Sequence, residues 1–218
     1  MATLSTTSTL WKKKRKNRMN NFDLIRKMLS FPDENAFYFL QVLKRRKDNP
    51  ELRKDMVLLS DYYIYSLEQF DDLKQRIIDQ CDTENARAYF RLNRRDAKKV
   101  AMQVLKRTVD HIMSENYRAV KNAFASCAGE YHSDPDKKWI VDIDCVSIDT
   151  FNHAEVYNEV RNLILDLQSE AGKEPMLNLI RSKSGVHIVT RPFNLNKFKS
   201  RFPDIDVHKD NMVILYCK

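Results

Sequence analysis

The sequence predicts an α+β fold whose C-terminal part forms a largely antiparallel sheet. From residue 137 onward the expected elements run strand, helix, strand, strand, helix, strand, strand. Consecutive strands joined by a tight turn pair antiparallel. The chain has 218 residues, of which 43% are hydrophobic, so it can bury one core or form two small lobes that share a site.

Apolar periodicity places the C-terminal elements. It predicts a strand over 137–148, an amphipathic helix over 153–170 and a short helix near 194–201. Further strands are expected over 176–182 and 185–193, joined by a tight turn, and near 204–207 and 212–216. Residues 137–218 are therefore interpreted as one lobe.

The preceding residues, 19–136, are expected to form a helical and α/β lobe. Helices are predicted over 19–31 and 34–47, over 67–81, and from about residue 96 to residue 127. Strands are predicted over 55–66 and 86–93. Residues 1–18 begin with a Ser/Thr-rich stretch and continue with a basic run, which predicts a disordered basic tail.

The charge of the chain is compatible with a polyanionic partner. The formal net charge is +8, and Lys and Arg side chains that neutralise phosphates release counterions. In the tail, phosphate backbone could be bound by Lys12, Lys13, Lys14, Arg15 and Lys16. The alternative is a solvated tail on a basic protein that has no nucleic-acid partner.

Composition excludes several classes of protein. Only 3 Gly and 6 Pro are present, which argues against a Gly-rich phosphate loop. None of the 4 cysteines belongs to a C-x-x-C pair, so neither a sequence-local zinc site nor a disulfide framework is expected. No apolar run reaches the ~20 residues of a membrane span, and no secretory signal is recognised. These features predict a cytoplasmic protein.

Two aspartates stand out on the strand over 137–148. Side chains alternate between the faces of a strand, so Asp142 and Asp144 point the same way, about 7 Å apart. Two carboxylates on one face repel each other unless a cation lies between them. Mg²⁺ or Mn²⁺ fits, because hard cations prefer carboxylate oxygens. The alternative is a pair of aspartates at a solvated strand end.

The turn between the next two strands offers groups that suit a triphosphate. It contains Ser182, Lys183, Ser184 and Gly185, and His187 follows on the second strand. Hydroxyls, a cation, backbone N–H groups and a His can all bind phosphate oxygens, and the glycine allows close approach of a ligand. The alternative is a polar hairpin whose His is satisfied by its own neighbours.

The order of these motifs resembles the archaeo-eukaryotic primase superfamily. The pattern is hydrophobic-D-hydrophobic-D, then S-x-S-G-x-H, then a late strand that carries an acid, and it is strongest over 137–218. The superfamily includes the small primase subunit, primase-polymerases and the polymerase domains of bacterial end-joining ligases. The resemblance implies a two-lobed primase core, with an N-terminal α/β lobe and an RRM-like catalytic lobe over 137–218.

The resemblance also implies roles for individual residues. Asp142 and Asp144 would be the first metal ligands, and Ser184 and His187 would contact the phosphates of the nucleotide. Asp206 is favoured as the third acid, and Asp204 and Asp210 are the alternatives.

The strand over 86–93 is interpreted as a wall of the nucleotide or template groove. Its alternating face carries Arg87, Tyr89 and Arg91, and Arg94 and Arg95 extend a basic rim that could contact nucleic acid. The alternative is the polar outer face of a half-exposed strand. Lys209 and Arg191 are further candidates for phosphate contacts.

The function implied by the resemblance is template-directed nucleotidyl transfer by a DNA primase or primase-polymerase. Its substrates would be an NTP or dNTP and a single-stranded DNA template, with Mg²⁺ or Mn²⁺ as cofactor. A separate helicase or replication protein could load the template, and a phage or mobile element would be a fitting source. Three alternatives stay open: a non-catalytic nucleotide or nucleic-acid binding module, a metal-dependent nuclease, and a nucleotide-sugar glycosyltransferase.

Overall fold

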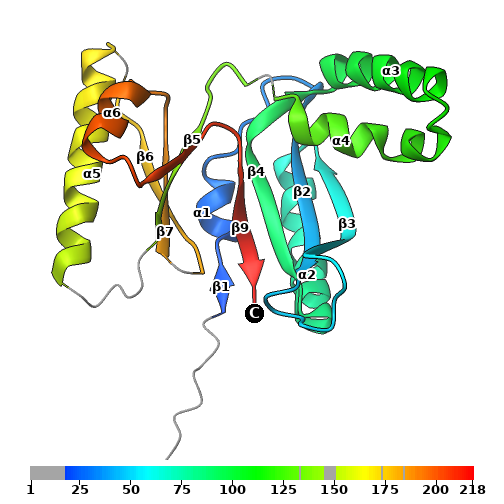
Figure 1. The fold of residues 1–218 in the computed structure, drawn as a ribbon, viewed down its shortest axis with the longest axis horizontal. Coiled ribbons are helices and arrows are strands. Elements are labelled where there is room, and N and C mark those ends of the chain that lie inside the picture. The colour runs from blue at the N-terminus through cyan, green and yellow to red at the C-terminus, as the bar shows by residue number, and fades with distance from the viewer. Residues whose placement is uncertain (1–17, 133, 145–150, 173, 184) are drawn as a thin grey trace, which may run out of the picture.

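A computed structural model of the chain describes residues 18–132, 134–144, 151–172, 174–183 and 185–218. It contains two antiparallel sheets with helices packed on them, which confirms the α+β class (Figure 1). The predicted antiparallel pairing of the C-terminal strands is also confirmed. No helix within these residues has the length and apolar character needed to cross a membrane.

The first sheet has the strand order β1-β9-β4-β2-β3. Its strands are β1 (Met19–Asn20), β2 (Ala36–Arg45), β3 (Met56–Ile64), β4 (Arg87–Asp96) and β9 (Met212–Cys217). One face is covered by α1 (Phe22–Arg26) and α2 (Leu67–Glu84), in a core that includes Tyr38, Leu40 and Phe90. Aromatic and aliphatic residues at alternate positions of the strands build this core, as a half-covered sheet requires.

The other face of the first sheet is covered only at one end. There α3 (Ala97–Met113) and α4 (Ala123–Glu130), joined by a 3₁₀ helix η1 (Tyr117–Asn122), form a smaller core with the strands, in which Phe37 and Phe39 contact Val100 and Cys127. The opposite end of this face carries Leu43, Tyr89 and Ile214. That end faces the second sheet and lines a cavity.

The second sheet has the strand order β6-β7-β5-β8. Its strands are β5 (Trp139–Asp144), β6 (Leu177–Arg181), β7 (Gly185–Thr190) and β8 (Asp206–His208). With α5 (Phe151–Glu170) and α6 (Leu195–Arg201), the chain order is β-α-β-β-α-β, the arrangement of a split β-α-β motif. Both helices lie on the side away from the first sheet (Figure 1), and Val141, Ile143 and Ile188 pack under them.

The last strand joins the first sheet, which differs from the predicted lobe over 137–218. β9 pairs with β4 and with β1, so a division at residue 137 does not separate the two sheets. β9 is buried over nearly its whole length. A strand that is apolar on both faces needs a central position between two strands, and a local pattern does not specify which sheet supplies it.

Two predicted helices are wrong. Residues 34–47 contain the ten-residue strand β2, because their apolar side chains pack on both faces of the first sheet. The long helix expected over 96–127 ends at Met113, and the backbone of Glu115 takes a left-handed conformation with φ 56° that a helix does not continue through. The helix expected over 19–31 is limited to α1 (Phe22–Arg26), and Met19–Asn20 form β1. The expected elements that are confirmed include β3, α2, β4, β5, β6, β7 and α6.

Candidate functional site

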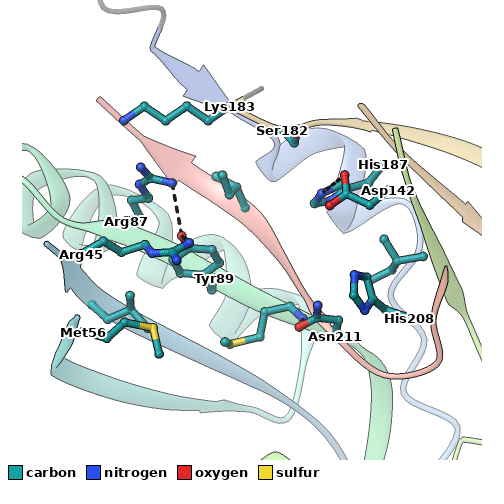
Figure 2. Close-up of a pocket in the computed structure, with 14 residues that line it drawn as sticks. Arg45, Met56, Arg87, Tyr89, Asp142, Ser182, Lys183, His187, His208 and Asn211 are labelled. Carbon is teal, nitrogen blue, oxygen red and sulfur yellow. Dashed lines mark hydrogen bonds and ion pairs between the residues drawn. The ribbon is translucent and has the colours of Figure 1, made fainter. Parts of the chain in front are cut away.

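A cavity of about 340 Å³ lies between the two sheets. Figure 2 shows Arg45, Arg87 and Tyr89 on one side of it and Asp142 and His187 on the other. The lining residues come from seven strands, the turn after β6 and the loop before β9: Leu43, Arg45, Met56, Arg87, Tyr89, Ile140, Asp142, Ser182, Lys183, His187, His208, Asn211, Met212 and Ile214. The fold therefore brings two regions that were singled out in the sequence, around Arg87 and around Asp142, to one cavity.

The second sheet presents a row of polar residues. Asp142 on the central strand β5 is paired with His187 of β7 on one side and with Asp206 of β8 on the other. Residues directly opposite each other in adjacent strands share a face. His208 lies opposite Ile140 in the neighbouring row, and both line the cavity. The same alternation that buries Val141 and Ile143 under the helices thus turns Asp142 toward the first sheet.

Asp142 is ionised more readily than an ordinary aspartate. His187 Nε2 lies 3.3 Å from Asp142 Oδ1. The imidazole lowers the pKa of the Asp142 carboxyl, against the opposing effect of burial, and His208 adds a smaller electrostatic attraction. A carboxylate at this position is therefore available to a cation at neutral pH.

Several buried polar atoms of the cavity have no hydrogen-bond partner among the described residues. They are Asp142 Oδ1, Ser182 Oγ, His187 Nδ1 and Arg45 Nε, and they make up four of the six such atoms in the described part of the chain. The 3.3 Å contact of Asp142 with His187 has an ion-pair distance but not the alignment of a hydrogen bond. An unpaired buried polar group costs about 1–3 kcal/mol. Their concentration in one cavity indicates a place for a polar ligand.

The opposite side of the cavity is cationic. Arg87 Nε lies 2.6 Å from Asp48 Oδ2, and Lys183 Nζ pairs with Asp48 Oδ1. Arg45 Nη1 and Arg87 Nη1 both donate to Tyr89 Oη, at 3.3 and 3.4 Å. Arg87 and Lys183 thus share one carboxylate, and Arg45 adds a further positive charge, so this side keeps a net positive charge.

Asp48 stays ionised although it is largely buried. Burial opposes its charge, but the hydrogen bond from Lys183 and the attraction of Arg87 outweigh burial and lower the pKa of this carboxyl. The backbone of Asp48 is also fixed in place, since Asn85 Nδ2 donates to its carbonyl oxygen. It therefore fixes where the two cations point.

The far end of β4 does not form the expected wall of a groove. Arg95 is buried and donates to Asp210, Asn93, Ala128 and Gly129. Arg91 Nη1 lies 3.4 Å from the same Asp210 carboxylate. Arg91, Arg95 and Asp210 therefore form a structural cluster, because a buried guanidinium needs a full set of acceptors. This arrangement argues against Arg95 as part of a basic rim and against Asp210 as a metal ligand.

Other candidates also lie outside the cavity. Arg94 Nη2 is 2.6 Å from the buried carboxylate of Asp134. Lys209 Nζ lies over the Trp139 ring, 5.5 Å from its centroid, and Arg191 contacts Asp136. Asp204 is exposed at the surface and does not line the cavity.

The residues expected to bind metal fit a cation in part. Asp142 lines the cavity and has a buried carboxylate oxygen that accepts no hydrogen bond among the described residues. Asp206 lies opposite Asp142 in the register but is exposed and does not line the cavity. The backbone of Asp144 lies opposite Gly185, and its side chain is outside the described residues. No group of three His, Cys, Asp or Glu side chains at metal-binding distance occurs among the side chains that are described.

Two sequence predictions fall outside the described residues. These are Ser184 and the tail cations Lys12, Lys13, Lys14, Arg15 and Lys16. On either side of Ser184, Ser182 N donates to Gly185 O at 2.9 Å, so β6 and β7 are closely joined, as expected.

Sequence reasoning missed four residues of the site: Arg45, Asp48, His208 and Asn211. Arg45 belongs to the run KRRK at 44–47, which was assigned to a helix, so its alternation with Leu43 on a strand face was not considered. His208 lies two residues after Asp206, and the same alternation would have found it. Asp48 follows β2 in a loop, and no local pattern indicates its partners.

The arrangement suits a ligand that combines phosphates with a divalent cation. Phosphates fit the side with Arg45, Arg87 and Lys183, and a cation fits the side with Asp142. No protein-family model, no curated protein and no solved structure matches this chain.

Proposed function

We propose that this chain is a DNA primase or primase-polymerase-type nucleotidyltransferase, which transfers a nucleotide from a nucleoside triphosphate to a 3′-hydroxyl. One observation carries the proposal. Asp142 and His187 of the second sheet face Arg45, Arg87 and Lys183 across one cavity. These are the two kinds of group that a metal-bound triphosphate needs, and they come from both halves of the chain.

The fold gives further support. The chain order β-α-β-β-α-β, with β7 and β5 at the centre of the second sheet, is compatible with an RRM-like lobe. The first sheet has one end of a face that no helix covers, and this end faces the second sheet across the cavity. Such an arrangement is compatible with a two-lobed primase core. The motifs of the sequence point to the same superfamily.

Several residues of the cavity would have a role in binding the nucleotide. Lys183, Arg87 and Arg45 bind the phosphate oxygens, and Asp48 fixes the direction of the first two. Ser182 and His187 offer unpartnered polar atoms that orient the nucleotide. Catalysis of this kind depends mainly on positioning and charge neutralisation.

Asp142 would hold Mg²⁺ or Mn²⁺ together with Asp144, and Asp206 is the nearest further acid by strand register. Such ions activate the attacking hydroxyl and stabilise the leaving pyrophosphate when bound. Single-stranded DNA would be the template, and a separate helicase or replication protein would supply it. We place this activity in the cytoplasm of a bacterium or a phage-infected cell.

The test is incorporation of labelled nucleotide on single-stranded DNA with Mg²⁺ or Mn²⁺, with and without a primer. Primer-free products that disappear in Asp142→Asn/Asp144→Asn support a primase, and products that need a primer support a polymerase. Asp166→Asn is a matched control, since this aspartate is exposed on α5, on the other side of the second sheet. It should keep full activity. Products that persist in the double variant would refute the assignment of the site.

A second candidate is a nucleotide- or nucleic-acid-binding module without catalysis. Asp206 is exposed and is not among the residues that line the cavity, which favours this candidate. This candidate predicts that the affinity for a labelled triphosphate depends on Lys183 and Arg87. It also predicts that no pyrophosphate is released. Shortened DNA instead of extended DNA would indicate a nuclease with the same metal chemistry.

A further inference from the structure

An apolar stripe runs along the outer side of α3. Thirteen large hydrophobic side chains are exposed among the described residues, and five of them belong to this one helix. The stripe consists of Met102 (62% exposed), Leu105 (61%), Val109, Ile112 and Met113 (81%). Scattered exposed hydrophobic residues are ordinary, but a contiguous patch of this kind marks an interaction site.

The inner side of α3 is fixed to the protein. Val100 is buried and Val104 packs in the same cluster with Phe37 and Cys127. Arg107 pairs with Glu130 of α4 and donates to Ser126 Oγ at 2.7 Å. The side chain of Asp96 caps the start of the helix by accepting from Lys99 N. α3 therefore has a defined orientation, and the stripe cannot turn inward without breaking these contacts.

The spacing of the stripe fits a helical partner. Met102, Leu105, Val109 and Ile112 are separated by three, four and three residues, which are successive a and d positions of a heptad. On a helix these positions form a narrow seam, and each side chain can insert between residues of a facing helix. Met113 widens the seam at its C-terminal end.

The flank of the seam is basic. Lys99 and Lys106 occupy successive e positions, both are exposed, and Lys98 lies at the N-terminal end of the seam. Against these three lysines α3 carries one acid, the exposed Asp110, four residues after Lys106. A second copy of the chain is a poor partner. Antiparallel pairing of Met102 with Ile112 and of Leu105 with Val109 would bring Lys106 of the two copies together, and each chain carries a net charge of +8.

We propose that the outer face of α3 is a docking site for an amphipathic helix of another protein that carries acidic residues beside its apolar seam. The site does not depend on the proposed function. Figure 1 shows α3 at the end of the molecule away from the second sheet, so a helix bound there leaves the cavity open. A partner could therefore be held at α3 while the cavity binds its ligand.

Binding of two synthetic helical peptides to the full chain tests the proposal. Both have leucine at the a and d positions. One carries Glu and the other Lys at the e and g positions. We expect the Glu peptide to bind at least about tenfold more tightly at low salt, with a difference that shrinks as salt screens the flank. Fluorescence anisotropy of labelled peptide measures both affinities.

Variants of α3 identify the surface. Leu105→Glu/Val109→Glu should weaken binding of the Glu peptide at least about tenfold, because it places charge in the seam. Lys99→Glu/Lys106→Glu should reverse the preference between the peptides. Leu179→Glu is the matched control, since Leu179 is 45% exposed on β6, and it should bind as the unchanged chain does.

Three outcomes would overturn the proposal. One is equal affinity for the two peptides, and another is binding that the seam variant leaves unchanged. The third is a dimer of the unmodified chain in sedimentation that Leu105→Glu/Val109→Glu dissociates, which would make a second copy the occupant. Circular dichroism of each variant shows that α3 is still folded.

Discussion

The two ends of β4 carry arginines in opposite situations. At one end Arg87 lines the cavity and shares the carboxylate of Asp48 with Lys183. At the other end Arg95 is fully enclosed, and its guanidinium donates to Asp210 and to three backbone carbonyls. Both clusters form around one aspartate, yet only the first retains cationic groups that a ligand can reach.

The difference shows that the exposure of the cations and their use of backbone acceptors, and not the presence of arginine, separate a binding cluster from a structural one. Asp210 also accepts from Asn93 and Arg91, and the Arg95 side chain is 0% exposed. Around Asp48 two cations, Arg87 and Lys183, likewise share one carboxylate, but the Lys183 side chain is 45% exposed. The comparison can be tested at each end of the strand.

The largest effect is expected at the closed end. Arg95→Ala removes the main partner of the Asp210 carboxylate and leaves the carbonyls of Ala128 and Gly129 without a donor. Breaking a buried ion pair from one side costs about 3–5 kcal/mol of unfolding free energy. Urea unfolding followed by circular dichroism measures the loss.

Arg46→Ala is the control for that loss. The Arg46 side chain is 60% exposed and lies 4.0 Å from Asp55, which is 92% exposed, so removal of the Arg46 side chain should cost less than about 1 kcal/mol. Equal losses in the two variants would contradict the structural role of the Asp210 cluster.

A smaller effect, on binding, is expected at the open end. Lys183→Ala should lower the affinity for a nucleoside triphosphate about tenfold, because a hydrogen bond to a charged group contributes about 1.5–3 kcal/mol. Since the Lys183 side chain is 45% exposed, the free energy of unfolding should change little. Titration with a fluorescent triphosphate analogue gives the affinity.

Lys121→Ala provides the matched control, because Lys121 is exposed on η1 and is not among the cavity residues. It should bind the analogue like the unchanged chain. If both variants lose affinity equally, binding follows net charge and not the cavity.

The smallest effect concerns pH and the pair of Asp142 with His187. The pKa of Asp142 is lower in the folded chain than the usual value of about 3.9, so the unfolded chain binds more protons in acid. The stability from this pair is therefore present above about pH 4 and is lost as pH falls through the folded pKa. The unfolding free energy of the unchanged chain minus that of Asp142→Asn should be smaller at pH 3 than at pH 6. A difference that does not depend on pH would contradict the pairing.

Much of the site followed from short patterns. Alternation along a strand predicted that Asp142 would share a face with Asp144, and it also predicted that Arg87 and Tyr89 would point the same way, as their place in the cavity confirms. The tight turn after Ser182 was expected from its residues. Alternation alone did not predict which arginines of β4 line the cavity and which belong to the Asp210 cluster with Arg91 and Arg95. Burial of Arg95 depends on α4, which packs over that end of the strand and supplies two backbone acceptors.

The sequence by itself determined the α+β class, most elements, the acidic strand and the turn at Lys183, because these depend on the properties of residues near each other in the chain. The tertiary structure decided that β9 joins the first sheet, that Asp48 reaches both Arg87 and Lys183, and that Arg95 is enclosed. Each of these joins residues from distant parts of the chain. Such contacts form because apolar faces must be covered and buried charges must have partners. The local periodicity of a sequence does not indicate which distant segment meets either requirement.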